Sequence, residues 1–256
     1  MTSTDTGDEQ RAAGDIARSL ELLWGSGERP TRGPKPGLTL ERIVTEAVRL
    51  ADAEGLAAVS MRRLSTELGT GTMSLYRYVP GKGDLVDLML DRVNTAPEES
   101  EPWTGGWREA VEAYARETLA LHRRHPWLLH VSQARPVLGP GAVGSLDRTL
   151  ARIRPMGLTD PELIGVIVMT EGYVTGVART QLHEAEATQK TGLSETAFWE
   201  AQAPTLDRIM RSGRYPSLAD LSGDAFGPDF DHFEFGLQRL LDGLDVLIAR
   251  RDQQRP

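Results

Sequence analysis

Residues 60–77 constrain the fold of this chain more than any other stretch. Two short helical patterns, at residues 60–68 and 72–77, stand on either side of a turn that contains Gly69 and Gly71. Two short helices joined by a glycine-bearing turn are typical of a helix-turn-helix. In such a unit the second helix enters the major groove of DNA. The segment therefore predicts a DNA-reading head.

Helical patterns continue on both sides of this segment. Upstream, Thr39 is placed to cap a helix whose apolar positions recur at helical spacing until Gly55. Downstream, another helix begins near Lys82, and Pro97 and Pro102 then mark a boundary. We therefore predict a helix-turn-helix DNA-binding domain at residues 38–95, built on a three-helix head.

The rest of the chain also has helical periodicity, with no convincing alternation typical of strands. A long apolar helix is predicted after a Thr159–Glu162 capping box, and a helix near residues 195–203 is predicted to end at Pro204. The last helix keeps one apolar face over about four turns, which favours a subunit interface. The expected fold is all-α, with a larger ligand-binding and dimerisation domain at residues 103–251.

Residues 1–37 are predicted to form a flexible arm. An amphipathic stretch at residues 16–24 either docks on the body or frays. Residues 25–37 contain three prolines and four glycines, which exclude a long helix. The arm is basic at residues 29–35, so it is a candidate for minor-groove contact through Arg29, Arg32 and Lys35.

Composition excludes several classes of protein. The formal net charge of −8 argues against non-specific coating of nucleic acid, so any DNA contact must be local. The chain has no cysteine, which excludes disulfides and thiolate metal sites. No run reaches the roughly 18 apolar residues of a membrane span, and the first ten residues do not form a signal peptide. We expect a cytoplasmic protein with no membrane contact.

The second helix of the turn segment has the side chains that DNA reading requires. At helical spacing Leu75 points into the head, while the positions around it point outward. Arginine pairs with guanine, methionine contacts a thymine methyl, and hydroxyls bond either base or phosphate. Cations also stand at Arg62, Arg63, Arg77 and Lys82.

The stretch from Arg63 to Leu85, RLSTELGTGTMSLYRYVPGKGDL, resembles the signature of TetR-family transcriptional regulators. The shared features are Gly69, the Leu75–Tyr76 pair, Tyr78 and Lys82. The chain departs from the pattern at Gly71, where the family often has a serine or threonine cap. The resemblance implies that the DNA-contacting positions are Arg62, Thr72, Met73, Ser74, Tyr76, Arg77, Tyr78 and Lys82.

The second half resembles, more loosely, the regulatory domain of the tetracycline-repressor subgroup. The similarity covers residues 122–136, residues 172–176 and the terminal FEFGLQRLLDGLDVLI. His130 lies near the subgroup's metal-binding histidine, but Thr180 stands at its acidic position, so we predict neither a metal nor another cofactor. Candidate residues of an effector pocket are Trp107, Trp127, His130, Met169, Tyr173 and Trp199, and for the tryptophans and the tyrosine the alternative is plain core.

The function that these patterns favour is a homodimeric, ligand-responsive transcriptional regulator. We expect a repressor that a small-molecule effector releases from a palindromic operator in double-stranded DNA; activation is the alternative mode. The alternative class is a helical ligand-binding or scaffold protein without sequence-specific DNA binding. No phosphate-loop motif, nucleophile elbow or catalytic triad is present, so an enzyme is not expected.

Overall fold

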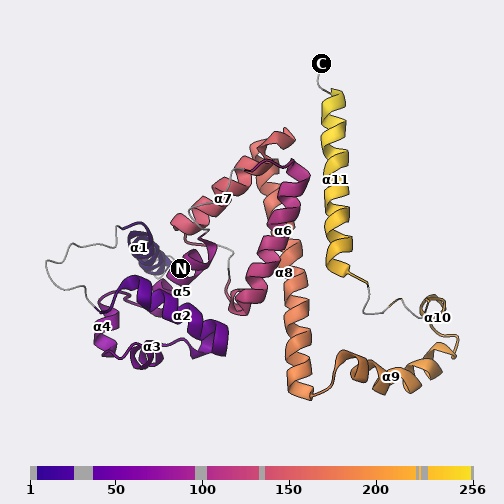
Figure 1. The fold of residues 1–256 in the computed structure, drawn as a ribbon, viewed down its shortest axis with the longest axis horizontal. Coiled ribbons are helices and arrows are strands. Elements are labelled where there is room, and N and C mark those ends of the chain that lie inside the picture. The colour runs from indigo at the N-terminus through magenta and orange to yellow at the C-terminus, as the bar shows by residue number, and fades with distance from the viewer. Residues whose placement is uncertain are drawn as a thin grey trace. The chain divides into compact units, whose positions relative to one another are not determined.

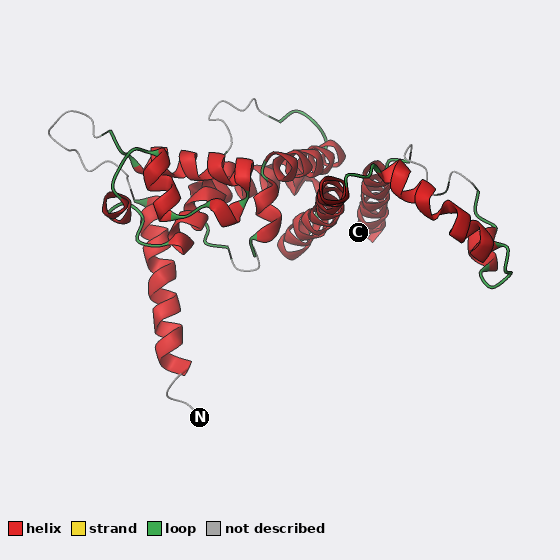
Figure 2. Ribbon diagram, turned by 90° about the horizontal axis from the view of Figure 1, so that it is seen from below, coloured by secondary structure: helices red, strands yellow, loops and turns green. Residues whose placement is uncertain are grey.

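The computed structural model describes residues 5–25, 37–95, 103–132, 136–222, 225 and 230–254. Within these ranges every regular element is a helix, as Figure 2 shows. The prediction of an all-α fold is therefore confirmed. None of the described helices is long and apolar enough to cross a membrane.

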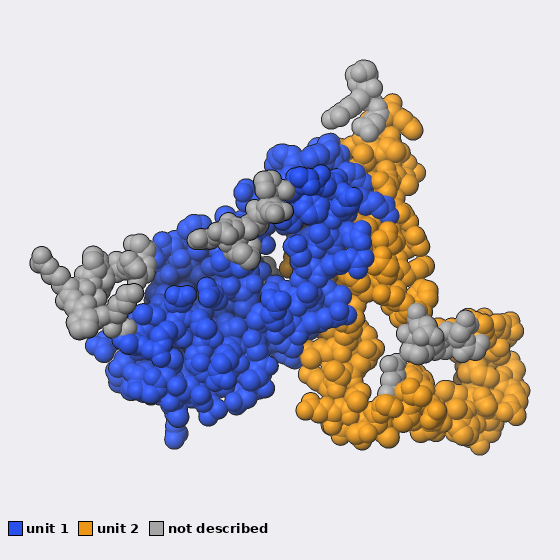
Figure 3. Space-filling view, in the orientation of Figure 1, with its two compact units in different colours: residues 1–166 blue, residues 167–256 orange. Residues whose placement is uncertain are grey.

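The chain divides into two compact units, residues 1–166 and residues 167–256 (Figure 3). The boundary falls inside the long helix α8, Asp160–Thr191, whereas the sequence suggested a division near Pro97 and Pro102. The remaining helices of the first unit are α1 Asp5–Trp24, α2 Leu40–Glu54, η1 Leu56–Ala58, α3 Met61–Glu67, α4 Thr72–Tyr76, α5 Lys82–Asn94, α6 Trp107–Arg124, η2 Pro126–His130, α7 Pro140–Ile153 and η3 Arg154–Met156.

The head is formed by α2 to α5 around one apolar core (Figure 1). The predicted cap at Thr39 is present, since its hydroxyl accepts from the Arg42 amide at 3.1 Å, and Ser60 caps α3 in the same way by accepting from the Arg63 amide at 3.2 Å. Gly69 ends the first helix of the turn segment with φ of 62°, a left-handed conformation that glycine adopts without steric cost. Fully buried residues of this core include Ile43, Ala47, Leu50, Val59, Leu64, Leu75, Val79 and Met89.

The core of the head extends into the segment that follows it in sequence. Trp127 and Leu128, in η2, are 1% and 2% exposed and belong to the same apolar cluster as α2 and α5. The Trp127 indole nitrogen donates to Asp52 Oδ1 at 2.8 Å, and His125 Nδ1 lies 2.7 Å from the same oxygen. The η2 segment is thus tied to α2, which explains why the first unit extends beyond the predicted head.

The N-terminal helix α1 lies beside α5 (Figure 1). The Ser19 hydroxyl lies 3.1 Å from Asp84 and 2.8 Å from Asp87, and Arg18 donates to Asp84 at 3.1 Å. The arm predicted for residues 1–37 is therefore helical at residues 5–24, because α5 offers it both polar partners and an apolar surface. The basic stretch at residues 29–35 lies outside the described residues.

The second unit consists of the remainder of α8 with α9 Glu195–Met210, α10 Pro216–Ala219 and α11 His232–Gln254. Its core joins α8 to α11: Val174, Leu237 and Leu241 are fully buried. Tyr173 on α8 donates from its hydroxyl to the carbonyl oxygens of His232 and Phe233, both at 2.9 Å. These contacts hold the two helices together at the beginning of α11.

The prediction that Pro204 ends a helix at residue 203 was wrong. The helix α9 continues through Pro204 to Met210. Pro204 and its neighbours Ala203 and Thr205 are exposed. A carbonyl group that loses its amide partner to a proline is satisfied by water at such an exposed position, so the helix tolerates the break.

Candidate nucleic-acid interface

Helices α3 and α4 form the helix-turn-helix, joined by residues 68–71. The turn is closed by backbone hydrogen bonds from Gly69 to Thr66 at 3.2 Å and from Thr70 to Ser65 at 2.9 Å. Leu64 on α3 and Leu75 on α4 are both fully buried, so the inward orientation predicted for Leu75 is confirmed. This shared core fixes which side of α4 points to solvent.

The outward side of α4 carries exposed side chains of several kinds. Met73 is 77% exposed and Tyr76 is 43% exposed, so both side chains are accessible to an outside partner. Arg77 follows directly at the end of α4 and is exposed. We use the name reading face for the side chains of Arg62, Thr72, Met73, Tyr76, Arg77 and Lys82, after the DNA contact that the sequence predicts for them.

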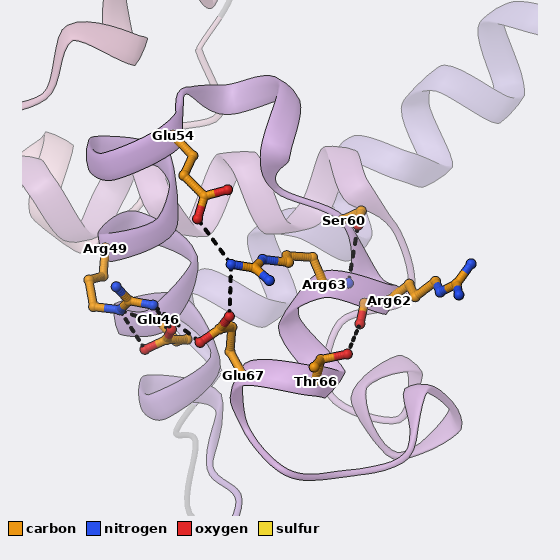
Figure 4. A network of polar contacts seen from close by, with 8 residues as sticks. All are labelled: Glu46, Arg49, Glu54, Ser60, Arg62, Arg63, Thr66 and Glu67. Atoms are coloured by element: carbon orange, nitrogen blue, oxygen red, sulfur yellow. Dashed lines mark hydrogen bonds and ion pairs between the residues drawn. The ribbon is translucent and has the colours of Figure 1, made fainter.

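Two adjacent arginines of α3 have different surroundings (Figure 4). Arg63 pairs with Glu54 and Glu67, both at 3.0 Å, and Arg49 on α2 joins the same network. The Arg62 side chain points away from this network. Among the described residues no carboxylate pairs with Arg62, so its charge is available to an outside anion.

Not every predicted contact residue is fully exposed. Ser74 and Thr72 are half-buried, and the Thr72 hydroxyl lies 3.1 Å from the Ser65 hydroxyl. Tyr78 is also half-buried, and its hydroxyl donates to the Leu38 carbonyl at 3.0 Å. That bond ties the end of the turn segment to the beginning of α2, so Tyr78 has a supporting contact within the head.

Lys82 is exposed at the first position of α5. Asp84, in the same turn, would repel a phosphate, but it is only 4% exposed and is paired with Arg18 and Ser19 of α1. Burial and the neighbouring Asp84 raise the pKa of Asp87, and the Ser19 hydrogen bond partly opposes this. Helix α1 thus covers acidic side chains of α5, the helix that begins with Lys82.

The predicted pocket residues divide between the two units. In the first unit Trp127 is buried in the head core, Trp107 is half-buried at the beginning of α6, and His130 is exposed. In the second unit Tyr173 is half-buried, Met169 is 37% exposed and Trp199 is 49% exposed. The packing of Trp127 against Asp52 gives this residue a structural contact with α2.

A groove of about 470 Å³ lies between α1, α2 and α5. Its apolar lining comes from Leu22, Leu23, Leu40, Val44 and Leu88, and none of the six predicted pocket residues lines it. Within the described part of the chain, no group of three histidine, aspartate or glutamate side chains is arranged to hold a metal ion.

Two family models match the chain. Residues 43–89 match the model described as "Bacterial regulatory proteins, tetR family", and residues 97–248 match "Tetracyclin repressor-like, C-terminal domain". The first match contains all of α3 and α4, and the second covers more than half of the chain. This chain belongs to the TetR family. It is therefore a DNA-binding transcriptional regulator and not an enzyme, as both halves of the sequence suggested.

A named relative and two solved structures are similar to this chain over most of its length. The HTH-type transcriptional repressor DrrR1 of Streptomyces coeruleorubidus is 62% identical over 97% of this chain and 95% of its own length. The structure of the TetR family protein ActR of Streptomyces coelicolor in complex with actinorhodin is similar, with a TM-score of 0.66 and 34% identity over 81% of this chain and 95% of that one. ActR in complex with (S)-DNPA gives a TM-score of 0.64 and 32% identity, over 82% and 98% of the two chains.

Sequence reasoning missed two features of this TetR-family head. Ser65 is buried and lies within hydrogen-bond distance of Thr72. The only sequence signal for this contact is the spacing of seven residues between the two hydroxyls. Arg18 and Ser19 were not expected to cover Asp84 and Asp87, because that contact joins residues more than sixty positions apart. Polar contacts over such distances leave no periodic signal in a single sequence.

Proposed function

We propose that this chain is a homodimeric repressor that binds a palindromic operator through its reading face and leaves it when a small organic effector binds. The observation that supports the proposal most directly is the contrast within α3 and α4. Leu64 and Leu75 are fully buried, whereas Met73 and Tyr76 are exposed, and no carboxylate in the described part of the chain pairs with Arg62. Apolar and cationic side chains together on a rigid, exposed surface suit a base-lined groove edged by phosphates.

Each side chain of the reading face has a role that its chemistry supports. Arg77 donates to the O6 and N7 atoms of a guanine, and Met73 contacts a thymine methyl. Arg62 and Lys82 contact phosphates and fix the register of the head on the duplex. Tyr76 and Ser74 add contacts from the same helix. Tyr78 supports the face through its bond to Leu38.

The second unit supports the dimer part of the proposal. On α11, Leu237, Leu241 and Leu244 are buried within the subunit, but Val246 is 49% exposed and Leu247 is 37% exposed. A second copy of the chain would cover these side chains and place two heads on half-sites roughly 34–36 Å apart. Leu247→Asp should then shift the sedimenting species from dimer to monomer, because a charge would enter an apolar contact. A dimer that persists would place the interface elsewhere.

The effector part of the proposal draws on ActR, whose structures contain actinorhodin and (S)-DNPA. These two compounds are the first probes to titrate into an operator complex. Release by either compound supports a related organic effector for this chain. If neither compound releases the operator or binds the protein, the transfer of ActR ligands to this chain is incorrect.

The operator is tested by selecting bound sequences from a random duplex pool at about 0.15 M salt, followed by footprinting. An enriched palindrome, protected over two major grooves on one side of the duplex, is the expected result. A pool without enrichment would favour the alternative, a helical ligand-binding protein without sequence-specific DNA binding. Arg63→Ala is the matched control, because Arg63 is paired with glutamates and should not change the selected sequence.

A further inference from the structure

A chain of hydroxyl contacts joins the two helices of the helix-turn-helix. Ser65 Oγ on α3 donates to the carbonyl oxygen of Arg62 at 2.8 Å and lies 3.1 Å from Thr72 Oγ1 at the beginning of α4. Ser65 is 7% exposed, so water does not compete freely for its hydroxyl. Thr66 also donates to the Arg62 carbonyl, at 3.2 Å, but it is exposed, and in the described part of the chain its hydroxyl makes no hydrogen bond to α4.

The number of hydroxyl hydrogens decides which group donates and which accepts in this series of contacts. A hydroxyl group has one hydrogen to donate and two lone pairs that accept. The Ser65 hydrogen is used in the bond to the Arg62 carbonyl, which has no hydrogen of its own. In the 3.1 Å contact, Thr72 must therefore donate and Ser65 accept. Thr72 is left with lone pairs only, so toward an outside partner it is an acceptor.

A hydroxyl that can only accept forms hydrogen bonds with some of the groups that DNA presents and not with others. Phosphate oxygens only accept, as do guanine O6 and N7 and thymine O4, so none of them can bond to Thr72 while its hydrogen is engaged. The amino groups at adenine N6 and cytosine N4 are the major-groove donors. We propose that Thr72 reads the exocyclic amino group of an adenine or a cytosine, and that Ser65 is the positioning residue that imposes this preference.

This inference rests on the proposed function, because it requires that α4 enters the major groove. It adds a base preference to a residue whose hydroxyl would otherwise serve phosphate and base alike. Thr72 therefore contributes to sequence recognition, whereas Arg62 and Lys82 contribute to affinity on every sequence. All three side chains are assigned to the reading face, but their donor and acceptor states separate their roles.

The test combines a protein variant with base analogues in the selected operator. Each adenine in turn is replaced by purine, and each cytosine by pyrimidin-2-one, which lack the exocyclic amino group. Wild-type protein should lose about threefold to tenfold in affinity at one position within each half-site, as expected for one hydrogen bond. Thr72→Val should show a similar loss on the natural operator and no further loss at that position.

Ser65→Ala tests the positioning role separately. Without the serine oxygen, Thr72 regains a free hydrogen and can donate to guanine or thymine. Selection with Ser65→Ala should therefore relax the preference at the same base pair and leave the other positions unchanged. Thr66→Val is the matched control, since it removes the neighbouring bond to Arg62 and should leave the preference intact. Thr72→Ser keeps the hydroxyl and should retain the wild-type motif, which guards against a folding defect in Thr72→Val.

Two results would overturn the inference. One is a loss with Thr72→Val that is equal on the natural operator and on every substituted duplex, which would indicate a phosphate contact. The other is an unchanged preference in Ser65→Ala protein that folds and binds. Both results presuppose that wild-type protein selects an operator. If wild-type protein enriches no sequence, the proposed function itself is wrong, so the two failures are distinguishable.

Discussion

The head carries arginines on two faces, and the arginines of the two faces differ in whether they pair with carboxylates. On the face formed by α2 and α3, Arg49 and Arg63 pair with glutamates at distances of 2.6 to 3.4 Å. On the reading face, Arg62 and Arg77 have no carboxylate partner in the described part of the chain. Arg62 and Arg63 are adjacent in sequence, so position alone does not decide which arginine is available to DNA.

The difference comes from the spacing of acids along the chain. Glu67 stands four residues after Arg63, on the same side of α3, and Glu54 reaches Arg63 from the end of α2. No acid occupies the equivalent positions for Arg62, since Thr66 stands four residues later. A protein with a net charge of −8 thus retains a local cationic surface, because its acids neutralise one face of the head and not the other.

Arg77→Ala should have the largest effect on the reading face. If Arg77 reads a guanine, the variant loses about 1–3 kcal/mol of binding free energy and accepts other bases at that position. Affinity measurements on a set of operators with single substitutions would reveal both changes. An equal loss on all operators would instead make Arg77 a phosphate contact.

The pair Arg62→Ala and Arg63→Ala tests the comparison of the two faces directly. Arg62→Ala should weaken binding to all sequences and reduce the slope of log affinity against log salt by about one unit. Arg63→Ala should leave that slope unchanged and lower the free energy of unfolding by less than about 1 kcal/mol, since exposed ion pairs contribute little. Equal salt slopes for the two variants would mean that the faces do not differ in DNA contact.

Lys82→Ala tests whether the reading face includes the beginning of α5. Removal of the lysine charge should again lower the slope of log affinity against log salt by about one unit, without any change in base preference. Arg92 lies on the same helix but within 3.6 Å of Glu41, so Arg92→Ala is the control for a cation outside the face. A salt slope that falls in the control and not in Lys82→Ala would place the DNA on a different surface.

The sequence predicted local features of the head well, because local rules determine them. The caps at Thr39 and Ser60, the glycine at the turn and the buried Leu75 follow from capping preference, backbone conformation and helical spacing. The contact residues of the reading face stay predictions, but the structure places the side chains of Arg62, Met73, Tyr76, Arg77 and Lys82 at the surface, as their assignment requires.

Contacts between distant segments were beyond the reach of the sequence. Trp127 was a candidate for an effector pocket or for plain core, and in the structure it is buried against α2 with its indole bonded to Asp52. The last helix has apolar residues all along one side, and periodicity could not tell that Leu241 faces its own subunit while Leu247 is exposed. The same lack of long-range information hid the contact of α1 with α5. Each of these features depends on which helix becomes the neighbour.

The acids of α5 that contact α1 provide the smallest of the expected effects. Asp87 is partly buried near Asp84, and burial, the larger cause, raises its pKa above the usual 3.8. Between pH 3.8 and the raised value the folded state binds more protons than the unfolded state, so this group lowers stability as the pH rises through that window. Asp87→Asn removes the charge and keeps an acceptor for the Ser19 hydroxyl. It should therefore stabilise the protein at pH 7 by less than about 1 kcal/mol, because solvent screens a partly exposed group. Thermal unfolding at pH 7 and at pH 4 measures the change: the gain should shrink at the lower pH, where wild-type Asp87 takes up its proton. A gain that is the same at both pH values would mean that the charge of Asp87 is not its cause, and a loss of stability would mean that the carboxylate bonded to Ser19 contributes more than its burial costs.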